Sequence, residues 1–217
     1  MQTNYYQNLS PEVDHGRWRV LPSIETTQAT MQALERRGIH PELVPNGPSA
    51  LSKLAGMIPA GADVMTAGSR TLEEIGLTDL LKSDEQRWHS LKAAILAETD
   101  PEKQLQLRRS ATLSDYYLGS VHAVTRAGQV VTASGSGSQL AAYAYSARHV
   151  IWVVGTQKIV PSLETALERV REYALPLEDS RMKSIGNGGS VLGKVLITEH
   201  ERPGRVSLIF VNEPLGF

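Results

Sequence analysis

One continuous stretch of this chain, residues 114–161, constrains its fold more than any other part. It contains a β-branched run at Val130–Thr132, a glycine-serine loop at 135–138, an apolar helical segment at Leu140–Tyr145 and a fully apolar run at Val150–Val154. The order strand, loop, helix, strand is typical of the unit from which parallel sheets are built. We therefore expect an α/β protein with a mostly parallel, Rossmann-like sheet flanked by helices.

Helix and strand signals continue through the rest of the chain. Ser23 and Gly38 suit the start and stop of one helix at 23–37, and Asp100 followed by Pro101 is typical of another helix start. Periodicity predicts further helices at 46–58, 78–99, 100–113 and 161–173, the last closed by Pro176, and strands at 39–44, 63–66, 194–198 and 206–211. The last two strands, joined by a turn at 202–205, are expected to form a small terminal β element.

The chain length of 217 residues suits one domain with a single core. We assign that domain to residues 22–217 and interpret residues 1–21 as a polar N-terminal arm. Tyr5, Tyr6 and Trp18 lie in the arm, and large amphipathic rings often anchor interfaces. The arm can therefore pack on its own chain or on a neighbour's, and we expect a homodimer.

Charge and cysteine content exclude several classes of function. The net charge is −1, so no basic excess points to a nucleic-acid partner. The chain has no cysteine, which excludes disulfides, thiolate nucleophiles and iron–sulfur clusters held by its own side chains. The histidines show no paired spacing typical of a metal site, and we predict neither a metal nor a cofactor. No signal pattern and no membrane-length apolar run is present, which indicates a cytoplasmic protein without a membrane partner.

Three loops rich in small and hydroxyl residues follow predicted buried strands, at residues 68–73, 134–139 and 155–158. Ligands of open α/β sheets bind in the crevice beyond the carboxyl ends of the strands, so we expect these loops to face one cavity. Backbone N–H groups exposed in such loops suit a small anion. None of the glycine patterns is the dinucleotide-binding fingerprint or a Walker phosphate loop.

The candidate site residues come from these loops and from one further junction. We predict titratable catalytic candidates at Glu73 and Asp115, and ligand-binding residues at Gly68, Ser69, Arg70, Thr71, Gly135, Ser136, Gly137, Ser138, Gln139 and Lys158. Each has a structural alternative. The glycines can serve only a tight turn, the hydroxyls only a helix cap, Glu73 only the helix dipole, and Asp115 only a cap or a buried hydrogen bond. Lys158 can be only a solvated lysine. His122, in an apolar segment, is interpreted as a core or interface histidine.

Four motifs give the chain a resemblance to a known family over residues 61–217. They are AGSRTLEEIG at 67–76, SDYYLGSVHAVT at 114–125, VVGTQKIV at 153–160 and the closing segment 204–217, which ends in LGF. These segments resemble those of the LUD-domain proteins, named for lactate utilisation. The resemblance implies a fold like that of the superfamily of sugar-phosphate isomerases, CoA-transferases and formyltetrahydrofolate cyclo-ligases. It also implies a pocket for a small anionic metabolite and iron–sulfur oxidoreductase subunits as partners.

The chain departs from the family pattern in two places. ASGSGSQ at 133–139 stands where relatives have a turn with an acid, an amide and an arginine, and GNGG at 186–189 stands where relatives often have a cysteine cluster. The leading hypothesis is a protein that binds an organic acid, a phosphosugar or an acyl-CoA-like compound in the strand-end pocket, and the sequence leaves catalysis open. The alternatives are a non-catalytic subunit of an iron–sulfur lactate-oxidising complex and a degenerate homodimeric scaffold.

Overall fold

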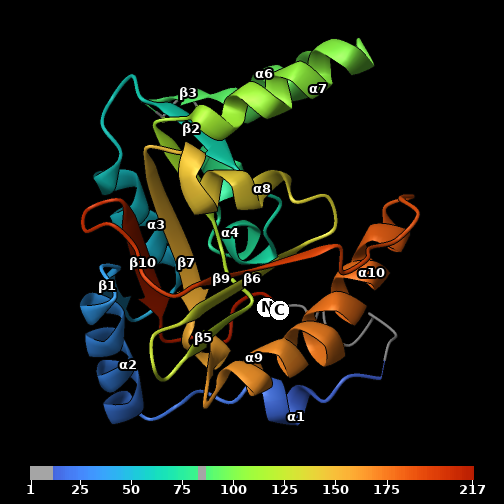
Figure 1. The fold of residues 1–217 in the computed structure, drawn as a ribbon. Coiled ribbons are helices and arrows are strands. Elements are labelled where there is room, and N and C mark those ends of the chain that lie inside the picture. Colours follow the sequence, from blue (N-terminus) through green and yellow to red (C-terminus); the bar gives the residue numbers. More distant parts are fainter. Residues whose placement is uncertain (1–11, 83–86) are drawn as a thin grey trace.

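A computed structural model of the protein describes residues 12–82 and 87–217. Its main sheet has six strands (Figure 1), in the order β1 (His40–Val44), β10 (Val206–Val211), β7 (His149–Gly155), β4 (Tyr116–Gly119), β2 (Asp63–Thr66) and β3 (His89–Ser90). All neighbouring strands in this sheet run parallel. The prediction of an α/β protein with a mostly parallel sheet flanked by helices is confirmed.

Strand β7 lies in the middle of this sheet and is buried on both faces. Val150, Trp152 and Val154 pack into one hydrophobic cluster, and Ile151 and Val153 pack into another on the opposite face. Successive side chains of a strand point to opposite faces, so a strand covered on both sides must be apolar at every position. This requirement explains the uninterrupted apolar run in the sequence.

Helices cover both faces of the main sheet. The cluster around Ile151 and Val153 is closed by α3 (Gly47–Met57), α4 (Arg70–Glu74) and α5 (Leu77–Leu80), and α2 (Ile24–Arg36) packs on the other face. The helices α6 (Leu91–Ala97) and α7 (Pro101–Ser110) extend from the β2 and β3 end of the sheet (Figure 1). The predicted caps are confirmed: Ser23, Ser69 and Asp100 each accept a hydrogen bond from a backbone N–H in the first turn of a helix.

A second sheet contains β8 (Ile159–Val160), β5 (Ala123–Thr125), β6 (Val130–Ser134) and β9 (Lys194–Thr198) in that order. Its β5–β6 and β6–β9 pairs are antiparallel and its β5–β8 pair is parallel. One face contributes to the cluster shared with the main sheet, and the other packs on α9 (Leu163–Arg169) and its continuation into α10 (Leu175–Ser184). The protein is therefore layered as helices, parallel sheet, second sheet and helices.

Two strand assignments made from the sequence are wrong. The strands β9 and β10 do not pair with each other, because β10 lies between β1 and β7 in the main sheet and β9 pairs with β6. The strands β6 and β7 belong to different sheets and do not form one parallel unit. Most of β10 is buried and apolar, which suits a central strand, whereas β9 is partly exposed along its length and suits an edge.

Two helix predictions are also corrected. The segment 78–99 is not one helix, because α5, β3 and α6 share it, and residues 83–86 lie outside the described part. Pro176 does not end the helix that starts at Leu163. A π-helical turn at Val170–Ala174 interrupts the regular hydrogen-bond pattern just before it, so the proline occupies the first turn of α10, where no backbone N–H is needed.

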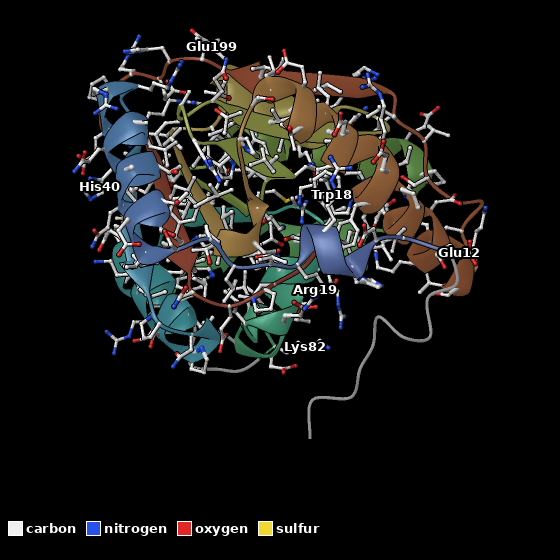
Figure 2. The ribbon with its side chains drawn as sticks, turned by 90° about the horizontal axis from the view of Figure 1, so that it is seen from below. Glu12, Trp18, Arg19, His40, Lys82 and Glu199 are labelled. Carbon is white, nitrogen blue, oxygen red and sulfur yellow. The ribbon has the colours of Figure 1, made fainter. Side chains whose placement is uncertain are left out.

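The described part of the N-terminal arm, residues 12–21, lies on its own chain. It forms the short helix α1 (His15–Trp18), and Trp18 is buried against Tyr173 beneath α9 (Figure 2). Arg17 pairs with Glu168 at 2.5 Å and with Glu172 at 3.3 Å. Tyr5 and Tyr6, which were expected to anchor the arm, lie outside the described residues. Among the helices of residues 12–82 and 87–217, none has the length and hydropathy of a membrane span.

Candidate functional site

A cavity of about 170 Å³ opens at the carboxyl ends of the central parallel strands. Members of all three predicted loops line it: Gly68, Ser69, Arg70 and Thr71 after β2, Ser134, Gly135 and Gln139 after β6, and Lys158 after β7. Residues 120–122 after β4 also line it, as do residues of α10, residues 190–192 and Phe217. Parallel strands bring their carboxyl ends to one edge of a sheet, so loops distant in the sequence meet there.

The loop at 134–139 contributes less than the sequence suggests. Ser136, Gly137 and Ser138 do not line the cavity, and the amides of Gly137 and Ser138 donate to the hydroxyls of Ser134 and Ser136. Gly137 has φ of +86°, which favours glycine, and a Cβ there would meet the side chain of Lys194 at 2.6 Å. The tight-turn alternative therefore fits these three residues.

Arg70 and the two glutamates of α4 form a local ion network. The Arg70 guanidinium lies 3.1 Å from Glu73 and 3.1 Å from Glu74, and Glu74 also accepts the backbone N–H of Gly216 at 2.7 Å. Glu73 does not line the cavity. It faces a separate groove between α4, α5 and α6, so its carboxylate serves Arg70 and the first turn of its helix.

Asp115 lies at the opposite edge of the sheet. It precedes the first residue of β4, whereas the cavity is at the carboxyl ends of the strands. Its carboxylate accepts the backbone N–H of Asp63 at 3.1 Å and lies 3.9 Å from the guanidinium of Arg148. Asp115 therefore joins the starts of β2 and β4. Its carboxylate has the structural role of a hydrogen-bond acceptor, which was the alternative to a catalytic role.

Lys158 places a buried amine at the wall of the cavity. Only 1% of the residue is exposed, and its Nζ lies 3.1 Å from Thr71 Oγ1 and 3.2 Å from Ser120 Oγ. Within the described residues no carboxylate comes within 4.0 Å of this nitrogen. Burial, and then the nearby charge of Arg169, lower the pKa of Lys158 well below its usual range.

His122, interpreted from the sequence as a core or interface histidine, lines the cavity. Its Nδ1 accepts the backbone N–H of Ala133 at 3.1 Å, so the neutral ring carries its proton on Nε2. Burial, the charge of Lys158 and the charge of Arg169 lower its pKa to about 3. Arg169 is itself buried and donates to the carbonyl oxygen of His122 at 2.6 Å. The sequence held one signal that His122 could reach the cavity: this residue lies three positions after the last residue of a buried strand.

The cavity is rich in donors but holds no cluster of metal ligands. Across residues 12–82 and 87–217, no three histidine, aspartate or glutamate side chains come together. Glu178, the carboxylate that lines the cavity, already accepts two bonds of 2.7 Å from Arg181. Hydroxyls, a neutral imidazole and an amine are therefore among the polar groups of the lining that can meet a ligand. They suit hydrogen bonding to an anion and acid–base or nucleophilic chemistry through nitrogen.

The fold and this cavity define an α/β protein with a small polar hollow at the carboxyl ends of a parallel sheet. The chain belongs to the LUD domain family, whose sequence profile matches residues 27–211. The crystal structure of a DUF162 family protein from Deinococcus radiodurans is similar, with a TM-score of 0.55 and 13% identity over 89% of this chain and 100% of that one.

Two further solved structures from Chaetomium thermophilum match part of the chain. The first, eIF2B beta, has a TM-score of 0.36 and 18% identity over 55% of this chain and 44% of that one. The second, eIF2B delta, has a TM-score of 0.35 and 16% identity over 57% of this chain and 54% of that one. A comparison with curated proteins gives no significant match.

Proposed function

We propose that this protein binds a small anionic metabolite in the cavity at the carboxyl ends of β2, β4 and β7. The observation that carries the proposal is Lys158, a buried amine without a carboxylate within 4.0 Å among the described residues. A buried amine keeps a proton only where a counter-charge offsets the cost of burying the cation, and an anionic ligand in the cavity supplies that counter-charge.

The size and wall of the cavity favour a compact organic acid within the broader class of organic acids, phosphosugars and acyl-CoA-like compounds. A volume of about 170 Å³ is close to that of an engineered cavity that holds benzene, at about 150 Å³. Ser69 and Ser134 accept backbone N–H bonds at 3.3 and 2.9 Å, and their hydroxyl hydrogens can still donate. The family's link with lactate utilisation makes short hydroxy and oxo acids the first compounds to test.

A thermal-shift titration tests this proposal. We expect a short carboxylate such as lactate or glyoxylate, or inorganic phosphate, to raise the unfolding temperature, since a ligand at 100 times its dissociation constant stabilises by about 2.7 kcal/mol. Lys158→Met should abolish the shift, whereas Lys103→Met, the same change on exposed helix α7, should leave it intact. No shift with any short carboxylate, phosphosugar or CoA ester would contradict the proposal.

A second candidate role, self-association, is favoured by the surface of α7. Within the described residues, α7 has no buried side chain, and Leu105 at its centre is 50% exposed. Glu102, Leu105 and Arg109 have the spacing i, i+3, i+7, which places them on one face of the helix. In an antiparallel pair of such helices, Glu102 of each copy faces Arg109 of the other across the two leucines. We propose that a second copy of this chain packs here by a two-fold contact.

Sedimentation measurements test this contact. We expect a dimer at micromolar concentration, and we expect Leu105→Lys to shift it toward monomer by at least tenfold in dissociation constant, because two like charges meet on the axis. The matched variant Leu113→Lys changes a leucine that is 70% exposed but lies beyond the helix, and it should have a smaller effect. A wild-type protein that is monomeric at all concentrations would refute the contact.

A further inference from the structure

We propose that Lys158 is a nucleophilic amine that condenses with the carbonyl group of a small oxo acid held in the cavity, forming an imine. This inference rests on the proposed function, because it concerns the same cavity and narrows its ligand to a carboxylate that also carries an aldehyde or ketone. It assigns chemistry to a residue that would otherwise serve only as a fixed charge.

The hydrogen bonds of Lys158 suit a neutral amine. An ammonium has three N–H donors, whereas a neutral amine has two N–H groups and one lone pair. The two side-chain partners of Nζ are the hydroxyl oxygens of Thr71 and Ser120, and both can accept. Two donated bonds therefore leave the lone pair available. Both partners belong to loops that line the cavity, so they hold the nitrogen at its wall.

The surroundings of Lys158 also favour the neutral form. The residue is 1% exposed, and the buried guanidinium of Arg169 raises the positive potential around it. A lysine that is desolvated and lies near a second cation is a recognised form of activated amine, because the free base is the nucleophile. Glu74 acts in the opposite direction but more weakly than Arg169, and its carboxylate is already bonded to Arg70 and Gly216.

The reaction balances without any oxidant or reductant. The lone pair of Nζ attacks the carbonyl carbon, the C=O electron pair moves to oxygen, and a proton passes from nitrogen to that oxygen to give a carbinolamine. Loss of the hydroxyl group with a second nitrogen proton then gives C=N and one water molecule. His122 lines the same cavity with a proton on Nε2, so it can donate a hydrogen bond to the departing oxygen.

The charge of the product explains why the carbonyl compound should be an acid. Uptake of one further proton from solvent by the imine nitrogen gives a cation, and burial in this cavity disfavours that cation as it disfavours the lysine ammonium. A carboxylate attached to the same carbon supplies a negative charge next to that cation. A neutral aldehyde offers no such compensation, so the structure favours an oxo acid over an uncharged carbonyl compound.

Reductive trapping of the intact protein tests the inference. Glyoxylate and cyanoborohydride are added near neutral pH, and the modified lysine is located by peptide mass spectrometry. We expect Lys158 to be labelled at least tenfold faster than the exposed Lys103 in the same molecule. Acetaldehyde, which lacks the carboxylate, should label Lys158 less than glyoxylate does. Excess acetate, which lacks the reactive carbonyl, should protect it.

Three outcomes separate this inference from the proposed function. Preferential labelling of Lys158 supports both the imine and the binding of an anion in the cavity. Lys92 lines the separate groove, and burial lowers its pKa as well. Labelling of Lys92 or of exposed lysines without preference for Lys158 overturns the imine, and if glyoxylate still raises the unfolding temperature, anion binding stands. If Lys158 is not labelled in preference to other lysines and glyoxylate gives no thermal shift, both the imine and anion binding are overturned. Lys158→Arg, which places a permanent cation in the cavity but cannot form an imine, should still bind glyoxylate, and its unfolding curve shows whether it folds.

Discussion

Replacing Gly155 by alanine is expected to destabilise the protein by about 3 kcal/mol or more, because the added methyl group has no space. A Cβ at Gly155 would meet the backbone oxygen of Glu213 at 2.6 Å and the backbone nitrogen of Leu215 at 2.7 Å, and it would clash with Gln157 Oε1. Two of these three atoms belong to the backbone and cannot rotate away. Thermal unfolding should show a midpoint lower by roughly 6 to 12 °C.

The same substitution should also disturb the cavity. Gly155 ends β7, and the segment 213–217 crosses it, with Leu215 O accepting a bond of 2.7 Å from Gln157 Nε2. Moving this segment shifts Gly216, which lies against Thr71 and Lys158. We therefore expect Gly155→Ala to weaken anion binding as well as folding.

Gly56→Ala is the matched control for this prediction. Gly56 lies inside α3, and a Cβ there would meet nothing within 4 Å. Alanine has a higher helix propensity than glycine, so this change should be neutral or stabilise by up to about 1 kcal/mol. If both variants lose stability equally, the close approach at Gly155 is not the cause.

The second large effect is a dependence of stability on pH that passes through His122. Its pKa is about 3 in the folded protein and 6.5 in the unfolded chain, so between these values the unfolded chain binds one more proton. The free energy of unfolding should therefore rise with pH by up to about 1.4 kcal/mol per pH unit in this window. The contribution of His122 to the free energy of unfolding is complete above pH 6.5 and is lost as the pH falls toward 3.

His122→Asn isolates this effect. The asparagine Oδ1 can accept the Ala133 N–H in place of Nδ1 and does not titrate, so the variant should lose less stability than the wild type between pH 6.5 and pH 4. Chemical denaturation at several pH values measures the difference. His40→Asn, at an exposed histidine labelled in Figure 2, should retain the wild-type slope. Equal slopes in the wild type and His122→Asn would contradict the assignment.

Local signals in the sequence were sufficient for most elements and for the place of the cavity. Ser23, Ser69 and Asp100 cap helices as predicted, because an N-cap depends only on a side chain and the amides two or three residues ahead. The loops after β2, β6 and β7 were recognised because a buried strand followed by small residues is a local pattern. The meeting of the loops after β2 and β7 followed from a general rule of parallel sheets, whereas the loop after β6 reaches the same cavity from the second sheet.

The same reasoning failed where the answer depends on partners distant in the sequence. It paired β9 with β10 because the two strands are neighbours joined by a short turn, although β10 has better partners in β1 and β7. It placed Asp115 among the site candidates although this residue precedes a strand, and a strand start in a parallel sheet lies at the edge opposite the carboxyl ends. It left His122 in the core or at an interface, since only the hydrogen bond from the Ala133 N–H to Nδ1 fixes the imidazole beside the cavity.

The sequence by itself determined the alternation of helices and strands, the capped helix starts and the family, because these depend on residue types at short spacing. Only the tertiary structure decided that the chain builds two sheets and that Thr71, Ser120 and His122 surround Lys158. The physical reason is that burial and electrostatic potential are properties of three-dimensional neighbours. Lys158 is an ordinary lysine in the sequence, and it becomes an activated amine only where burial and Arg169 disfavour its charge.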